Sequence, residues 1–298
     1  MTHKAGFVNI LGKPNVGKST LMNELVGEKL SIITSKAQTT RHRILGIVNG
    51  DDFQIIFSDT PGIIKPNYKM QESMMSFVRT SMEDADVFLY MAEIKDKPDN
   101  QPDEFLKILE NSKIPTLILI NKVDTIKDAE ELAVLKSRWE MDLSKSSNIE
   151  LRFISALNPE DAAGVFNWIV DKVPESPGYY PKDALTDKPE RFFVEEIIRE
   201  KILLNYKQEI PYSCEVVIES FKEEEAIIRI RAEIFVNRKS QKSIVIGKGG
   251  SMLKKVGTEA RKDAEAFFGK QIYLELFVRV KENWRDDDNM LKRLGYRS

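Results

Sequence analysis

Residues 12–19 have the composition and spacing of a loop that binds the phosphates of a nucleotide. Four residues separate Gly12 from Gly17, and Lys18 and Ser19 follow directly. The glycines let the backbone curl so that successive N–H groups point at phosphate oxygens, and the helix expected next adds its positive N-terminal end. Lys18 would reach the β and γ phosphates, and the Ser19 hydroxyl would bind Mg²⁺. The expected phosphate-loop contacts are Gly12, Lys13, Pro14, Asn15, Val16, Gly17, Lys18, Ser19 and Thr20.

A ligand-free turn between a strand and a helix is the alternative interpretation of this motif. An apolar run over residues 7–11 precedes it, and Leu21, Leu25 and Val26 follow it at helical spacing. Because the strand and the helix that a phosphate loop needs are both indicated, we favour nucleotide binding. The motif specifies neither the base nor the reaction.

A second group of candidate residues ends the apolar run at residues 54–59. Asp59 would act on Mg²⁺ through water, and the N–H of Gly62 would contact the γ-phosphate. The polar segment 31–43 is expected to be a mobile loop whose threonine closes over Mg²⁺ when the triphosphate is bound, with Thr40 as first choice and Thr39 as second. The expected nucleotide contacts here are Asp59, Thr60, Pro61 and Gly62, and the expected metal-binding residues are Ser19, Thr40 and Asp59.

The base is indicated by Asn121, Lys122, Val123 and Asp124, which follow the apolar run 116–120. A carboxylate at Asp124 can accept hydrogen bonds from guanine N1–H and from its exocyclic amine, which adenine does not offer in that arrangement. The Lys122 stem would cover one face of the base. Alone this tetrapeptide is typical of a solvated turn, but after the two preceding motifs it predicts guanine. The backbone of Ser155, Ala156 and Leu157 is expected to meet guanine O6.

The second half of the chain carries a G-x-x-G loop at residues 247–250. Such a loop lets a nucleic-acid backbone approach closely, and residues 237–257 contain no acidic side chain to repel phosphates. A lone G-x-x-G is equally typical of a solvated helix-turn-helix. Here a helix and two strands precede it and a helix and a strand follow, which favours a type II KH domain and RNA as its ligand. The expected RNA-binding residues are Arg238, Lys242, Ile246, Gly247, Lys248, Gly249, Gly250, Lys254 and Lys255.

Strands that alternate with helices over residues 1–174 predict an α/β fold with a mostly parallel sheet covered by helices on both faces. One antiparallel hairpin is expected around the turn at residues 49–52. Four of the twelve prolines lie in residues 174–189, which lack periodicity. We therefore expect a P-loop GTPase domain over residues 1–174, a linker over residues 175–189, and an α+β type II KH domain with a C-terminal helix over residues 190–298.

Composition is that of an ordinary protein of 298 residues with a net charge of −2. Residues 1–189 hold 28 acidic and 23 basic side chains, whereas residues 190–298 hold 19 and 22, so the second part leans basic. The single cysteine, Cys214, excludes an intramolecular disulfide and suits a reducing cytoplasm. Neither a membrane span nor a secretion signal is indicated by the sequence, and a cytoplasmic monomer is expected.

Taken together, these motifs resemble the Era family of bacterial GTPases. The resemblance rests on the phosphate loop, Thr39-Thr40-Arg41, the motifs at Asp59 and Asn121, Ser155, and the KH-like sequence 245–250, and it covers essentially the whole chain. It implies a GTP-hydrolysing switch that uses Mg²⁺ with GTP or GDP. It also implies binding to the 3′ end of 16S ribosomal RNA and a role in assembly of the 30S subunit. Peripheral association with the inner face of the cytoplasmic membrane is implied only by the resemblance.

Position 63 departs from Ras-like hydrolases, which carry a water-orienting glutamine there, because this chain has Ile63. Slow intrinsic hydrolysis is therefore expected, with acceleration by a partner, a cation or a reordered loop. As in the potassium-dependent members of this GTPase class, Asn15 would help to coordinate K⁺ beside the phosphates. No catalytic residue is assigned with certainty, and the candidate transition-state groups are Asn15, Lys18, Thr40 and Gly62.

Two other classes of function were weighed against a GTP-switched RNA-binding factor. A GTPase that acts with a tRNA-modifying enzyme, or one with two GTPase domains, would need a different appended domain. A metabolic phosphotransferase would use the phosphate loop on a small molecule, and it would not need the guanine-reading residues 121–124.

Overall fold

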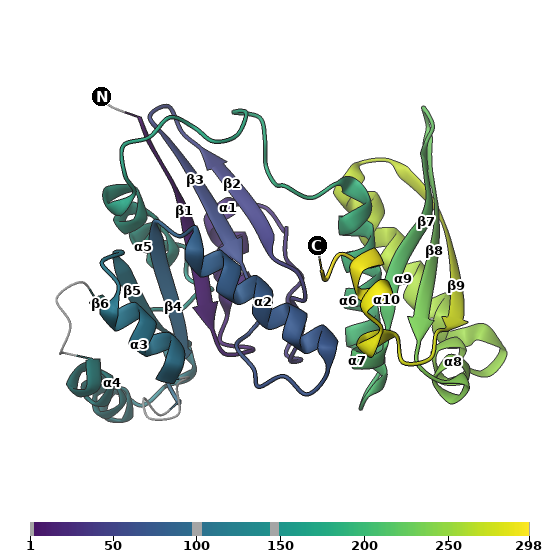
Figure 1. Ribbon diagram of the computed structural model, residues 1–298, viewed down its shortest axis with the longest axis horizontal. Coiled ribbons are helices and arrows are strands. Elements are labelled where there is room, and N and C mark those ends of the chain that lie inside the picture. Colours follow the sequence, from purple (N-terminus) through teal and green to yellow (C-terminus); the bar gives the residue numbers. More distant parts are fainter. Residues whose placement is uncertain (1–2, 97–102, 144–148, 298) are drawn as a thin grey trace. The chain divides into compact units, whose positions relative to one another are not determined.

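The computed structural model of the protein describes residues 3–96, 103–143 and 149–297 (Figure 1). Contacts between residues divide the chain into two compact units. The first unit comprises Met1–Ser31, Thr40–Lys65 and Met74–Asp187, and the second comprises Ile32–Thr39, Pro66–Ser73 and Lys188–Ser298. Two short segments from the N-terminal half therefore pack as parts of the second unit, which the sequence pattern did not indicate.

The first unit is built on a six-stranded sheet in the order β2-β3-β1-β4-β5-β6. The β2–β3 pair is antiparallel, as the turn at residues 49–52 predicted, and the other neighbouring pairs are parallel. Central strands are apolar almost throughout because both faces of the sheet are covered. The strands are β1 (Lys4–Gly12), β2 (Ile44–Asn49), β3 (Phe53–Asp59), β4 (Val87–Glu93), β5 (Thr116–Asn121) and β6 (Ile149–Phe153).

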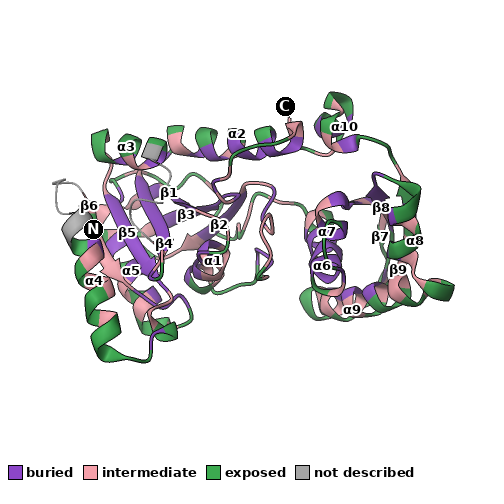
Figure 2. Ribbon diagram, turned by 90° about the horizontal axis from the view of Figure 1, so that it is seen from below, coloured by how far each residue is buried: buried purple, intermediate pink, exposed green. Residues whose placement is uncertain are grey.

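Helices cover both faces of this sheet, with α1 and α5 on one face and α2 and α3 on the other (Figures 1 and 2). Three methionines of α2, Met70, Met74 and Met75, are buried in the core between this helix and the sheet. The α/β class with a mostly parallel sheet is thereby confirmed. The helices are α1 (Lys18–Val26), α2 (Lys69–Glu83), α3 (Asp103–Asn111), α4 (Ala129–Leu143) and α5 (Pro159–Lys172), with a 3₁₀ turn at Val123–Thr125.

Residues 176–187, which lie inside the expected linker, are fastened to the sheet of the first unit. The buried Gln54 of β3 accepts hydrogen bonds from the N–H groups of Tyr179 and Tyr180, at 2.6 and 2.9 Å, and donates to the Tyr180 carbonyl at 2.8 Å. The N–H of Ile47 donates to Leu185 O at 2.8 Å. A linker role for residues 175–189 stays a prediction, but this part of the chain is held by specific bonds rather than left free.

The second unit contains a three-stranded sheet in the order β7-β8-β9, in which β7–β8 is antiparallel and β8–β9 is parallel. Helices α6 and α9 pack on one face of this sheet and bury a core of aliphatic side chains. Its elements are α6 (Glu190–Asn205), α7 (Ile210–Ser213), β7 (Glu215–Glu223), β8 (Ile227–Val236), α8 (Lys239–Ile246), a 3₁₀ turn (Lys248–Gly250), α9 (Ser251–Phe268), β9 (Gln271–Val280), a 3₁₀ turn (Trp284–Asp286) and α10 (Asp288–Arg293).

The C-terminal segment packs on the second unit. The Asp287 side chain caps α10 by accepting from two backbone N–H groups. The fully buried Trp284 donates its indole N–H to Ser213 O at 3.1 Å, and the Tyr296 hydroxyl donates to the Glu215 carboxylate at 2.6 Å. The C-terminal helix that the sequence predicts is present as α10.

We predict that Gln54→Leu loosens residues 179–180 from the sheet, because the N–H groups of Tyr179 and Tyr180 lose their acceptor while the bond from Ile47 to Leu185 remains. The variant should lose about 2 kcal/mol of local stability, since each N–H left without a partner costs roughly 1–3 kcal/mol. Hydrogen exchange at these two amides should accelerate by at least tenfold, while exchange in β5 stays unchanged. Substitution of the exposed Lys182 by alanine serves as the control. Unchanged exchange in the Gln54 variant would contradict the assignment.

Candidate functional site

The candidate nucleotide residues gather at the carboxyl ends of the strands of the first unit. Strand β1 lies between β3 and β4, so the chain connections leave it in opposite directions at this point. Ligands of open α/β sheets bind where the strand order reverses in this way. The phosphate loop follows β1, Asp59 ends β3, Asn121 ends β5, and Ser155 follows β6.

Lys18 begins α1 and folds back over the phosphate loop. Its ammonium donates to the carbonyls of Gly12 and Lys13, at 3.1 and 2.9 Å. Burial lowers the pKa of Lys18 to about 8, and the Asp59 carboxylate opposes that shift. A buried cation that donates to loop carbonyls favours the arrival of phosphate oxygens, which carry more negative charge than carbonyls do.

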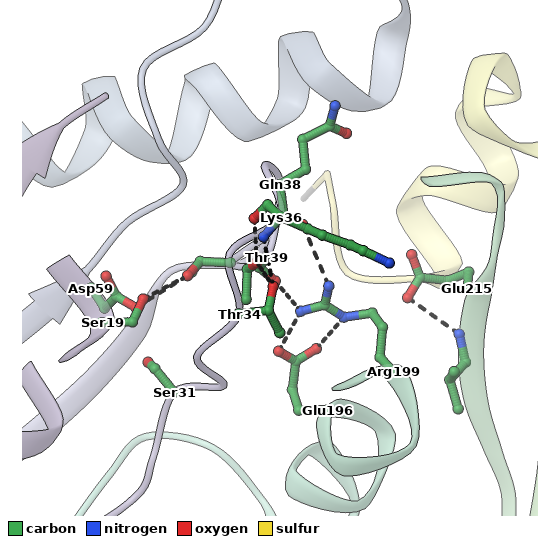
Figure 3. A network of polar contacts seen from close by, with 12 residues as sticks. Ser19, Ser31, Thr34, Lys36, Gln38, Thr39, Asp59, Glu196, Arg199 and Glu215 are labelled. Atoms are coloured by element: carbon green, nitrogen blue, oxygen red, sulfur yellow. Dashed lines mark hydrogen bonds and ion pairs between the residues drawn. The ribbon is translucent and has the colours of Figure 1, made fainter. Parts of the chain in front are cut away.

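Three side chains with oxygen atoms converge beside Lys18. One comes from α1, one from the segment that precedes β2, and one from the end of β3. The Ser19 hydroxyl donates to Asp59 Oδ2 at 2.7 Å and lies 3.0 Å from the Thr40 hydroxyl, which is 3.3 Å from the same carboxylate oxygen (Figure 3). Asp59 is fully buried, and among the residues that the structure describes its second oxygen, Oδ1, has no hydrogen-bond partner. Two hydroxyls and a buried carboxylate with a spare oxygen suit Mg²⁺, which prefers hard oxygen ligands.

This geometry separates the two threonine candidates. Thr40 joins the group at Asp59, whereas the Thr39 hydroxyl donates to Lys36 O at 2.6 Å and lies 2.7 Å from the Thr34 hydroxyl. The Thr39 hydroxyl is thereby bonded within its own loop. Thr40, the first choice as a Mg²⁺ ligand, stays the better candidate.

Gly62 comes directly against the phosphate loop. A Cβ placed on Gly62 would lie 2.6 Å from the backbone nitrogen of Pro14, so only glycine fits there. The next residue, Ile63, donates its N–H to Gly12 O at 3.0 Å and buries its side chain. The position that holds a catalytic glutamine in Ras-like hydrolases therefore presents an apolar group to the core.

The guanine-reading residues are tied to the phosphate loop through one amide. Asn121 donates to Val16 O at 2.7 Å and accepts the N–H of Ala156 at 2.8 Å, so it joins three loops. Asp124 lies in the exposed 3₁₀ turn after β5, where its carboxylate is accessible to a base. The backbone of residues 155–157 is expected to meet guanine O6, and in the structure the N–H of Ala156 donates to Asn121.

Two residues of this site were not indicated by the sequence. Glu93 ends β4 and pairs with the ammonium of Lys122 at 2.8 Å, which fixes the stem expected to cover the base. Asp161 accepts the N–H of Ser155 at 2.7 Å and so holds the last loop. The one available signal for Glu93 was its place at the carboxyl end of a strand, since all the other nucleotide residues lie at that edge.

The second unit offers a separate groove beside its glycine loop. Gly247, Gly249 and Gly250 all have positive φ, so the loop turns tightly between α8 and α9 with Lys248 exposed at its tip. Strand β9 is an edge strand, and its outer backbone groups are unpaired with any strand in the described parts of the chain. A cavity of about 380 Å³ runs beside the loop, lined by Gly250, Leu253, Lys254, Gly257, Thr258, Arg261, Leu274 and Leu276.

The basic residues expected to bind RNA surround this loop. Arg238, Lys254 and Lys255 are exposed, and Lys242 is half-buried on α8. Ile246 ends α8 and is partly buried against the core, so its backbone rather than its side chain faces the loop. The sequence did not indicate that residues of α9 and β9 line this cavity, because their apolar pattern is equally typical of a packed helix and strand.

The fold and the two sites define a P-loop GTPase joined to a KH domain. Family models agree with this assignment, since residues 7–122 match the family described as 50S ribosome-binding GTPase and residues 209–285 match the KH domain. The chain is 40% identical to GTPase Era of Ruminiclostridium cellulolyticum over 299 residues, which cover 100% of this chain and 99% of that one. It is 46% identical to chloroplastic GTPase ERA1 of Zea mays, over 99% of this chain and 71% of the relative.

The chain therefore belongs to the Era family of GTPases. A crystal structure of Era in complex with MgGDPNP and nucleotides 1506–1542 of 16S ribosomal RNA superposes with a TM-score of 0.93 at 37% identity, covering 99% of this chain and 100% of that one. An Aquifex aeolicus Era variant bound to GDP·AlF₄⁻ gives a TM-score of 0.92, also at 37% identity, with the same coverage. The expectations of a GTPase domain and a C-terminal KH domain are confirmed.

Lys18 leads to a prediction about the pH dependence of nucleotide affinity. Phosphate charge beside the ammonium raises its pKa above the value of about 8 in the free protein, so nucleotide binding takes up protons near that pH. GDP affinity should fall about threefold between pH 7.5 and pH 8.5, because the free protein loses the charged form over this range. Calorimetry in buffers of different ionisation enthalpy measures the uptake. Binding at pH 8.5 without proton uptake would show that Lys18 is already fully charged in the free protein.

Proposed function

We propose that this GTPase is a nucleotide-switched RNA-binding factor that recognises the 3′ end of 16S ribosomal RNA during assembly of the 30S subunit. The observation that carries the proposal is the combination, in one chain, of a complete guanine-nucleotide site and a basic G-x-x-G groove. The relative solved with a segment of that RNA, similar over nearly the whole chain, supports the choice of RNA.

The groove suits single-stranded RNA for three physical reasons. The glycine loop, without side-chain bulk at its sharpest turns, lets a sugar-phosphate backbone approach closely. Lys248 and Lys254 supply charge for phosphates on one side. Leu274 and Leu276 of the edge strand β9 offer an apolar floor for bases, while the free backbone groups of β9 can form hydrogen bonds with base edges.

In the nucleotide site we assign Ser19, Thr40 and Asp59 to Mg²⁺ and the phosphate-loop residues to the phosphates. Bound Mg²⁺ would neutralise charge between the β and γ phosphates. Lys18 would leave the loop carbonyls for the phosphate oxygens, and Gly62 would place its N–H against the γ-phosphate. Asp124 would read guanine while Glu93 holds Lys122 over the base.

The segments that pack in the second unit suggest how the nucleotide controls RNA binding. Arg199 of α6, oriented by two hydrogen bonds that it donates to the Glu196 carboxylate at 2.7 and 2.6 Å, also donates to the carbonyls of Thr39 and Gln38 (Figure 3). Lys36 donates to two carbonyls at the C-terminal end of α6, where a cation also complements the helix dipole. Residues 32–39 thus belong to the second unit, and the very next residue, Thr40, lies beside Asp59.

Residues 66–73, which lie a few positions after Gly62 in the sequence, are also held in the second unit. Lys69 pairs with Asp288 at 2.7 Å and donates its N–H to Asp286 at 3.1 Å, while Arg285 lies over the ring of Tyr68 at 4.5 Å. Both segments adjoin the residues that would sense the γ-phosphate. Order imposed by GTP on Thr40 and Gly62 would therefore bias the second unit and its RNA groove.

Hydrolysis itself has no side chain in the usual water-orienting place. We propose that K⁺, held in part by Asn15, supplies positive charge beside the phosphates in place of an arginine finger. Asn15 has a φ of 65°, which turns the loop sharply at the position where such a cation would bind. A cytoplasmic monomer and peripheral membrane contact remain expectations; within the described residues, no helix combines the length and apolarity that a bilayer crossing needs.

The RNA proposal predicts the behaviour of a charge reversal at the loop tip. Lys248→Glu should weaken binding of an RNA that copies the 3′ end of 16S ribosomal RNA by about tenfold at moderate salt, and it should reduce the salt dependence. GTP hydrolysis should stay unchanged. The matched control is Lys292→Glu on α10, an exposed lysine away from the groove.

The same RNA should be titrated with a GTP analogue, with GDP and without nucleotide. Tighter binding in the GTP-analogue form supports the switch, and equal affinity in all three states would refute the coupling. Absence of binding in every state would refute the RNA assignment.

The cation proposal predicts faster hydrolysis in K⁺ than in Na⁺ at the same ionic strength. Asn15→Ala should remove the difference by lowering the rate in K⁺ to the rate in Na⁺. Single-turnover rates with bound GTP measure this without a contribution from product release. Equal rates in the two salts for the unaltered protein would contradict a role for K⁺.

A further inference from the structure

Arg43 forms a polar clamp within the first unit that the nucleotide contacts leave unexplained. Arg43 ends the segment that carries Thr40 and directly precedes β2, which begins at Ile44. Its Nε donates to the Ser58 hydroxyl at 2.8 Å, and its two terminal nitrogens donate to the two oxygens of Asp84 at 2.7 and 3.0 Å. One guanidinium therefore makes three hydrogen bonds.

One partner of Arg43 is the direct neighbour of an expected Mg²⁺ ligand in the sequence. Ser58 precedes Asp59 on β3, and in the sheet Asp59 pairs with Ile44 on one side and Ile10 on the other. Asp84 follows the last residue of α2 and accepts a longer bond, at 3.4 Å, from Asn9 of β1. The clamp thus connects the strand before the phosphate loop, the strand that ends in Asp59, and the segment that brings Thr40.

We propose that Arg43 is a positioning residue for the Mg²⁺-dependent recognition of GTP. It anchors the C-terminal end of the segment 40–43 to the strand that carries Asp59, so that the Thr40 hydroxyl stays within reach of the ion. The inference rests on the proposed Mg²⁺ site. Arginine is required because a lysine ammonium at this position lacks the planar fork that matches the carboxylate while Nε reaches Ser58.

A surface ion pair without functional consequence is the competing explanation. Exposed pairs contribute little, and the Asp84 side chain is 41% exposed. The Arg43 side chain is only 17% exposed, however, and Ser58 is fully buried, so the bond between them is better shielded from water than the ion pair with Asp84. The buried bond is the one that reaches the neighbour of Asp59, which is why we assign a positioning role rather than a purely structural one.

The experiment compares affinities for a non-hydrolysable GTP analogue and for GDP as Mg²⁺ is titrated. Thr40 would contact the ion only in the triphosphate state, so Arg43→Met should weaken binding of the GTP analogue about tenfold at saturating Mg²⁺. The Mg²⁺ concentration at half-maximal binding should rise, and GDP affinity should change less than about twofold. GDP affinity also reports that the variant is folded.

A double-mutant cycle with Thr40→Ala identifies the route of the effect. If Arg43 acts through Thr40, Arg43→Met should cause no further loss of GTP-analogue affinity in the Thr40→Ala background. Arg43→Lys should behave like Arg43→Met, because lysine cannot form the fork. The control is Arg152→Met, which removes a half-buried arginine from β6 of the same unit, where it donates to Gly164 O at 2.9 Å.

Equal losses for GTP analogue and GDP, or additive effects in the cycle, would overturn the proposal in favour of general stabilisation. An unchanged Arg43→Met variant would overturn it as well. These failures are distinct from failure of the Mg²⁺ site, which would appear in the unaltered protein as GTP-analogue binding that does not respond to Mg²⁺.

Discussion

The buried carboxylate of Asp59 is the constraint on which the nucleotide site depends. A carboxylate without solvent exposure costs several kcal/mol unless charge and hydrogen bonds compensate it. Burial raises the pKa of Asp59, while Lys18 and the hydroxyls of Ser19 and Thr40 oppose that rise. These compensating groups come from two elements far apart in sequence. The carboxylate is therefore satisfied only when α1, β3 and the segment before β2 are assembled together, and in the proposed site Mg²⁺ would complete this arrangement.

Those parts of the fold and the site that depend on local sequence could be predicted. A phosphate loop requires glycines, a lysine and a hydroxyl at fixed spacing, and the strand and helix around it are short-range consequences of that spacing. The hairpin at residues 49–52 and the tight turn at residues 247–250 are likewise set by glycine and polar residues within a few positions. The order of the motifs then indicated that the base is guanine. Each motif lies at the end of a strand, and these strand ends meet at one edge of the sheet.

Contacts between distant polar residues could not be predicted. Gln54 binding Tyr180, and Glu93 binding Lys122, depend on which strands become neighbours, and an isolated glutamine or glutamate carries no such signal. The choice between Thr39 and Thr40 also needed the structure, since adjacent threonines look alike in sequence but point to different partners. Residues 32–39 showed only a polar segment without periodicity, and nothing in it indicated that it packs with the helix at residues 190–205.

The charged side chains that hold residues 32–39 in the second unit, Arg199 and Lys36, donate to backbone carbonyls, and this bears on what the second unit would detect in the proposed switch. Arg199 contacts the carbonyls of Gln38 and Thr39, so it responds to the path of the chain rather than to side chains. In the proposed switch, a nucleotide state that shifts Thr40 would move the adjacent carbonyl and change those bonds. Because linkage is reciprocal, RNA that alters α6 would change GTP affinity by the same factor. In the proposed switch, the coupling would be set by the difference in free energy of these charge-assisted hydrogen bonds and of the contacts of residues 66–73 between the two nucleotide states.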